Sequence, residues 1–145
     1  MNVQYVIDNI FRRDPKMKAN LCYSQNGEDL ILNRFLENKE KGFFIDVGAH
    51  HPIRFSNTYF FYKKGWSGIN IDLDDSSIKL FNKYRSNDLN ITALVSNDET
   101  IKKTYIYHGR SPINTVEQDL VNLKDDKPKK IIEKKSITLN KIIEN

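Results

Sequence analysis

The stretch Gly42-Phe43-Phe44-Ile45-Asp46-Val47-Gly48-Ala49-His50-His51-Pro52 decides the fold of this chain. Its apolar run is continuous instead of alternating and starts after a glycine, which is typical of a strand buried on both faces in a parallel α/β sheet. Asp46 interrupts the run just before Gly48, and an unpaired buried carboxylate is costly. Ligands of open α/β sheets bind beyond the carboxyl ends of the strands, so the sequence predicts a ligand site at Asp46 and Gly48.

Composition places the chain among ordinary globular domains. It has 145 residues, a net charge of +4 and no apolar run long enough to span a membrane. The first eleven residues lack a small-residue cleavage site, so we expect no signal peptide and a cytoplasmic location. The single cysteine, Cys22, excludes an internal disulfide and is expected to be a small buried apolar side chain.

The order of predicted elements indicates two βαβ units. Apolar spacing and capping residues predict helices at residues 3–11, from Ser24 through Leu36, from Ser56 or Asn57 to Gly65, and from Asp74 or Asp75 to about Asn87. Strands are predicted at residues 42–47, 66–73 and 90–96. Strands that alternate with helices favour a parallel sheet.

The pattern changes after residue 96. Alternation at residues 103–108 predicts an edge strand, Thr115 can cap a short helix, and a charged linker near residues 124–130 precedes a strand that ends at Ile137. Thr138 can cap a final helix. We therefore expect an N-terminal helix and loop at residues 1–22 and a domain at residues 23–145.

The chemistry lies in two carboxylates and a glycine turn. Asp72 closes the second strand, 24 residues after Gly48, close to the spacing of an acidic residue that binds the ribose hydroxyls of a nucleoside held at the first strand. A dinucleotide would need glycines where the chain has His50 and Ile53, and Pro52 removes a backbone donor. S-Adenosylmethionine has no phosphate and carries a sulfonium cation, so it suits the acidic Asp46 better than a pyrophosphate does.

These residues carry a resemblance to a known family. The chain resembles the N-terminal half of the FkbM-like S-adenosylmethionine-dependent methyltransferases in four ordered motifs: residues 23–32 (YSQNGEDLIL), 42–52, 56–58 (SNT) and 65–72 (GWSGINID), with later matches at 114–115 and 137–143. The resemblance implies an α/β fold with a Rossmann-like parallel sheet and flanking helices. It also implies O-methylation of a hydroxyl on a sugar, a polyketide or a related small molecule.

The predicted site follows from the motifs and the resemblance together. Cofactor binding is expected at the ends of the strands and at the start of the second helix, by Gln25, Asp46, Gly48, Ala49, Asp72 and Ser96. His50 and His51 are candidate general bases, and the alternative for both is loop packing or backbone hydrogen bonding. We expect no bound metal, nucleic acid or membrane partner.

Two departures from the family leave alternatives open. The family usually has Glu-Pro where this chain has Asp72-Leu73, which alters the reach of the carboxylate. Family members also continue past the last predicted helix into further strands, so the first strand is expected to be an open sheet edge with unpaired backbone groups. The chain is then either a methyltransferase or an inactive fragment that pairs with another chain through that edge. An NAD-dependent enzyme is a further, weaker alternative.

Overall fold

The computed structural model describes residues 21–108 and 111–144. The described helices and strands are, in chain order, α2 (Glu28–Phe35), β1 (Phe43–Val47), α3 (Tyr59–Lys63), β2 (Ser67–Asp72), α4 (Asp75–Tyr84), β3 (Leu89–Thr92), β4 (Leu94–Val95), β5 (Ile101–Ile106), α5 (Gln118–Asn122), β6 (Lys130–Ile137) and α6 (Leu139–Glu144). The helix predicted at residues 3–11 lies outside the described residues.

A three-stranded parallel sheet forms the centre of the fold. Its order is β1-β2-β3, with Ile45 opposite Ile69 and Val47 opposite Ile71. The predicted α/β architecture, with a parallel sheet and flanking helices, is confirmed. The family-based expectation that the first strand is a sheet edge is also confirmed, because β2 is its one partner among the described strands.

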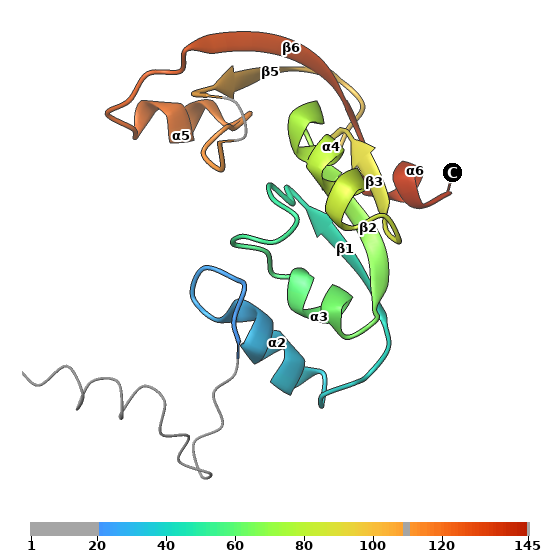
Figure 1. Ribbon diagram of the computed structural model, residues 1–145. Coiled ribbons are helices and arrows are strands. Elements are labelled where there is room, and N and C mark those ends of the chain that lie inside the picture. The colour runs from blue at the N-terminus through green and yellow to red at the C-terminus, as the bar shows by residue number, and fades with distance from the viewer. Residues whose placement is uncertain (1–20, 109–110, 145) are drawn as a thin grey trace, which may run out of the picture.

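The two faces of this sheet have different covers. Side chains of a strand alternate between faces. The face of Ile69 and Ile71 packs against Ile142 of α6, while the face of Phe44 and Asn70 lies toward α3 and α4 (Figure 1). Helix α4 buries Ile78 and Phe81. Helices α3 and α4 therefore form a layer on one face of the sheet, and α6 covers part of the other face.

One prediction about β1 is wrong. The strand was expected to be buried on both faces, but Phe43, Ile45 and Val47 are exposed to 60%, 37% and 50%. The reason is its edge position, because α6 covers the neighbouring β2 and no described element covers this face of β1.

The predicted third strand is also wrong as a single element. Residues 90–96 form two strands: β3 pairs with β2, and β4 pairs with β6 in a second sheet of order β4-β6-β5. Ala93 lies at the break, where its N–H still donates to the carbonyl of Asp72 at 3.0 Å. The chain therefore leaves one sheet and enters the other within a few residues.

The second sheet extends away from the first. Strands β5 and β6 are antiparallel, with Thr104 opposite Ile132 and Ile106 opposite Lys130, and α5 lies at their far end (Figure 1). We call residues 101–108 and 111–135 the arm. The predicted edge strand at 103–108 is confirmed with bounds two residues earlier.

Three predicted helix ends are confirmed and others are wrong. Asp74 caps α4 by accepting from the N–H of Ser76 at 2.7 Å, and Gly65 follows α3 with a φ of 91°. Thr138 Oγ1 accepts from the N–H of Lys141 at 3.4 Å at the start of α6. Helix α4 ends at Tyr84, before the expected Asn87. The N-cap of α3 is Thr58 instead of Ser56 or Asn57, and the N-cap of α5 is Glu117 instead of Thr115.

The start of α2 differs from its prediction. The residue at the N-cap is Gly27, and Ser24 instead bonds to Asp29 inside the first turn. Asp29 is fully buried and also accepts from the N–H of Tyr23 at 2.7 Å. Burial raises the pKa of Asp29, but the hydrogen bonds from Tyr23, Ser24 and Leu30 outweigh it, so the net pKa is lowered.

Two smaller findings complete the fold. Cys22 is exposed, contrary to expectation, because the segment that carries it runs along the surface ahead of α2. No helix in the described part of the chain combines the length and apolar character that crossing a bilayer requires.

Candidate functional site

A cavity of about 390 Å³ lies at the carboxyl ends of β1 and β2. One wall comes from the turn after β1 and the loop after β2. The other wall comes from the arm. The lining residues are Gly48, His50, Asp72, Leu73, Asp74 and Asp75 on the sheet side, and Ile106, Ser111, Pro112, Asn114, Lys130 and Ile132 on the arm side.

Asp72 links the two loops on the sheet side. One carboxylate oxygen accepts from the N–H of His50 and the other from the N–H of Asp74, both at 2.8 Å. A carboxylate has about four acceptor positions, so about two remain for a ligand. Asp72 therefore positions the turn after β1 and still presents acceptor capacity at the cavity.

The turn after β1 depends on a left-handed backbone. Gly48 has a φ of 74°, and a Cβ placed there would meet nothing within 4 Å. The requirement for glycine is therefore conformational, and the space beside it is open. The N–H groups of Gly48 and Ala49 both donate to the carbonyl of Ile71, at 2.9 and 3.1 Å, which fixes the turn to β2.

The two histidines of the turn have different surroundings. His50 has a φ of 57° and lines the cavity. His51 does not line it, and its Nδ1 accepts from the N–H groups of Ile53 and Arg54 at 3.1 and 3.0 Å. His51 thus shows the backbone hydrogen bonding that was the alternative to a catalytic role.

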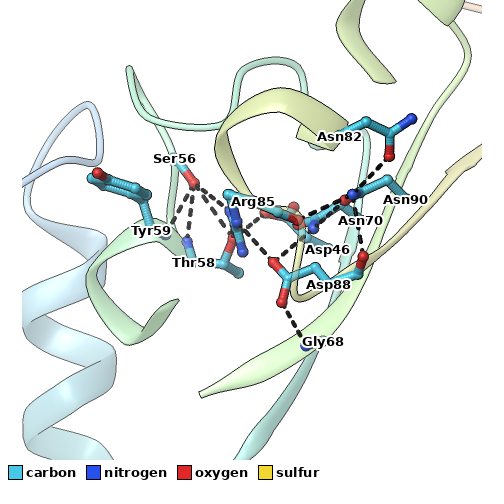
Figure 2. A network of polar contacts seen from close by, with 10 residues as sticks. All are labelled: Asp46, Ser56, Thr58, Tyr59, Gly68, Asn70, Asn82, Arg85, Asp88 and Asn90. Atoms are coloured by element: carbon cyan, nitrogen blue, oxygen red, sulfur yellow. Dashed lines mark hydrogen bonds and ion pairs between the residues drawn. The ribbon is translucent and has the colours of Figure 1, made fainter. Parts of the chain in front are cut away.

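Asp46 is not among the residues that line the cavity, and its carboxylate belongs to a polar network with Thr58 and Arg85 (Figure 2). Its carboxylate accepts from the hydroxyl of Thr58 at 2.7 Å, and Thr58 in turn accepts from Arg85 at 2.9 Å. Burial raises the pKa of Asp46, and Asp72 adds to this effect, against the opposing influence of Thr58 and Arg85. Part of the reason for a carboxylate at this position is therefore its neighbours Thr58, just before α3, and Arg85, just after α4.

Asp88 closes the same network on the other side of Arg85. It pairs with Arg85 Nε at 2.8 Å and accepts from the N–H of Gly68 and the side chain of Asn70, both at 3.0 Å (Figure 2). Gly68 is needed here because a Cβ would collide with the ring and carbonyl oxygen of Phe44. The network thus fixes the loop after α4 against β2.

The structure brings together only part of the predicted site. Gly48, Asp72 and the candidate base His50 line one cavity. Ala49 lies behind the turn and is buried against Ile78 and Phe81.

Two predicted cofactor residues lie elsewhere. Gln25 is exposed ahead of α2 and does not line the cavity. Ser96 follows β4, where its N–H donates to the carbonyl of Ile137 at 3.0 Å. Both assignments stay predictions without a contact to the cavity.

Sequence reasoning missed the wall that the arm contributes. The sequence places Asn114 in a family motif, Lys130 in a charged linker and Ile132 in a predicted strand, and none of these patterns indicates a ligand site. The available signal was the two predicted strands, at residues 103–108 and ending at Ile137, which can pair as antiparallel neighbours. Within residues 21–108 and 111–144, no group of three or more His, Cys, Asp or Glu is arranged to hold a metal ion.

A comparison with family models decides the affiliation. The model of the methyltransferase FkbM domain matches residues 46–145. The chain belongs to this family. All residues that line the cavity fall inside the matched segment of the FkbM domain, whereas Gln25 precedes it. Neither the comparison with curated proteins nor that with solved structures finds a match.

Proposed function

We propose that this FkbM domain binds S-adenosylmethionine in the cavity and transfers its methyl group to a hydroxyl of a sugar, a polyketide or a related small molecule. The parallel strands β1, β2 and β3 would be the nucleoside-binding half of a Rossmann-like methyltransferase fold. The observation that carries the proposal is Asp72, whose carboxylate lines the cavity beside the Gly48 turn.

The residues present fit a nucleoside that lacks a diphosphate. Asp72 retains acceptor positions for two neighbouring ribose hydroxyls, and the cavity of about 390 Å³ lies in the range of small-molecule sites. The space beside Gly48 is open, so a ligand can approach the backbone there. The acidic residues Asp72, Asp74 and Asp75 disfavour a diphosphate and are compatible with a sulfonium cation.

The bound cofactor would supply an electrophilic methyl group on a positively charged sulfur. The residues of this chain then have to hold and orient the reactants, which is a large part of the catalysis of such a transfer. Asp72 would hold the ribose, and the turn at Gly48 would set the depth of binding. His50, which lines the cavity, is the candidate to accept the proton of the acceptor hydroxyl.

The second candidate function is an interaction module without turnover. It is supported by the edge strand β1, which presents exposed apolar side chains and a backbone side that no other described strand pairs with. An NAD-dependent enzyme is disfavoured, because His50 occupies a position where a diphosphate-binding turn needs glycine.

Titration calorimetry with S-adenosylmethionine and S-adenosylhomocysteine tests the proposal. We expect binding by the native chain and a loss of about tenfold or more in affinity for Asp72→Asn, since one acceptor oxygen is replaced by a donor. Asp125→Asn, an exposed carboxylate away from the cavity, serves as the matched control and should bind normally.

The contradicting result is equally concrete. A folded sample that gives no heat with either ligand at millimolar concentration would rule out cofactor binding. Equal affinities of Asp72→Asn and the native chain would remove Asp72 from the site. Circular dichroism of each variant separates these outcomes from misfolding.

A further inference from the structure

One face of β6 is turned toward the cavity. Residues two apart on a strand share a face. Lys130 and Ile132 line the cavity, and Lys134 donates from Nζ to the carbonyl of Leu73 at 2.8 Å. The side chains of these three residues therefore share the face of β6 that lies toward the cavity and the loop after β2.

The side chain of Lys130 makes no hydrogen bond or ion pair within the described part of the chain, whereas the side chains of several other lysines do. Lys134 is bound to Leu73, Lys102 pairs with Asp98 at 3.1 Å, and Lys141 pairs with Glu99 at 2.8 Å. Among the described residues that line the cavity, Lys130 is the only lysine or arginine. Its ammonium group is thus available to a ligand.

The opposite wall has the complementary charge. Asp72, Asp74 and Asp75 lie there, and Asp75 already pairs with Lys79 at 2.7 Å. A ligand that fills the cavity would meet carboxylates on the sheet side and one ammonium group on the arm side. Such an arrangement favours a ligand that carries both positive charge and a carboxylate.

We propose that Lys130 binds the carboxylate of the amino-acid part of S-adenosylmethionine. This inference rests on the proposed function. The cofactor carries a sulfonium, an ammonium and a single carboxylate, so its charges match an acidic wall that faces one lysine. A charge-assisted hydrogen bond from a lysine is a strong contact for a carboxylate. The arm would thereby contribute to cofactor binding as well as covering the cavity.

Two ligands that differ in this carboxylate provide the test. S-Adenosylhomocysteine has the amino-acid part, and 5′-methylthioadenosine lacks it. In titration calorimetry we expect Lys130→Gln to lower the affinity for S-adenosylhomocysteine by about tenfold. The affinity for 5′-methylthioadenosine should be unchanged. Lys130→Arg keeps the charge and should restore most of the affinity. Lys135→Gln, an exposed lysine on the opposite face of β6, is the matched control.

Each other outcome overturns the inference in a recognisable way. Equal losses for both ligands would mean that Lys130 shapes the cavity without reading the carboxylate. No loss of affinity for either ligand would mean that the Lys130 side chain contacts the methyl acceptor or solvent instead of the cofactor. If the native chain binds neither ligand, the proposed function fails together with the inference. The titration of the native chain, which is done first, shows that outcome before any variant is compared.

Discussion

Arg85 is the residue on which the polar interior depends most. Its side chain is completely buried, and its guanidinium lies 4.9 Å from the ring centre of Phe44 and 5.3 Å from that of Phe81. Burial lowers the pKa of Arg85, while Asp88 and Asp46 oppose this effect. The cation therefore compensates two carboxylates that would otherwise be buried without a positive charge beside them.

Replacing Arg85 by methionine should strongly destabilise the fold. The substitution keeps much of the apolar volume but leaves Asp88 and Asp46 without their cation, which typically costs about 3–5 kcal/mol. Urea unfolding followed by circular dichroism measures the loss. Lys79→Met is the control, because it breaks the exposed pair with Asp75 and should leave the unfolding midpoint nearly unchanged. Similar midpoints for the two variants would contradict the role given to Arg85.

Asp46 makes a pH-dependent contribution to the free energy of unfolding. Its pKa is raised by burial, so the folded state binds a proton more readily than the unfolded state. The free energy of unfolding contributed by this residue therefore falls as the pH rises through the raised pKa. Ionisation of Asp46 in the folded state is therefore a cost to the fold.

Asp46→Asn should reveal that cost. The amide oxygen can still accept from Thr58, and no charge is buried. We expect the variant to be at least as stable as the native chain at neutral pH, with the difference shrinking toward zero below about pH 4, where an ordinary aspartate is protonated. Urea midpoints measured across that range check the sign. A difference that grows as the pH falls would show that the charge of Asp46 stabilises the fold.

At the scale of elements, the arm depends on few contacts with the rest of the site. Lys134 Nζ reaches the carbonyl of Leu73, which follows β2, and β6 joins β4 at Ser136 and Ile137. The cavity wall made by Ile132 and Lys130 lies beyond these attachment points. The position of the wall should therefore be sensitive to the attachment at Lys134.

Lys134→Met should loosen the arm without unfolding the domain. We expect faster amide hydrogen exchange at residues 130–135, because the side-chain contact with Leu73 is lost. Affinity for S-adenosylhomocysteine should fall severalfold, since one wall of the cavity is held less firmly. Lys135→Met, on the opposite face of β6, should change neither measurement. Unchanged exchange in Lys134→Met would show that the pairing with β4 and β5 is sufficient.

The elements that sequence could predict are those with a local cause. Gly65 and Asp74 mark helix ends through their own backbone and side-chain chemistry, and the apolar run at residues 43–47 marks β1. The break at Ala93 has no local signal, because Ile91, Ala93 and Val95 alternate regularly while their pairing partners change from β2 to β6. A pairing change is a property of the whole chain.

The site divides in the same way. Gly48 and Asp72 were predictable from their spacing and from the ends of their strands, and both line the cavity. Lys130 and Asn114 come from distant segments, so only the tertiary arrangement of the arm brings them to the site. Arg85 was missed because a single arginine after a helix gives no indication of burial in the sequence.

At the scale of the whole molecule, β1 leaves the sheet open on one side. The strand pairs only with β2 among the described strands, and Phe43 at its start is 60% exposed. Unpaired backbone groups beside exposed apolar side chains favour pairing with the edge of another chain. A second copy offers the same strand, so two edges could join symmetrically.

Sedimentation velocity over a concentration series tests this expectation. We expect the native chain to associate as its concentration rises, and Phe43→Lys to remain monomeric, since a lysine on an edge strand opposes pairing. Phe35→Lys is the matched control: Phe35 is 86% exposed but lies on helix α2, away from any sheet edge, so association should persist. Equal suppression by both variants would indicate general apolar adhesion, and a native chain that stays monomeric throughout would exclude self-pairing at β1. Because Phe43 does not line the cavity, Phe43→Lys should bind S-adenosylhomocysteine normally, which separates the edge from the site.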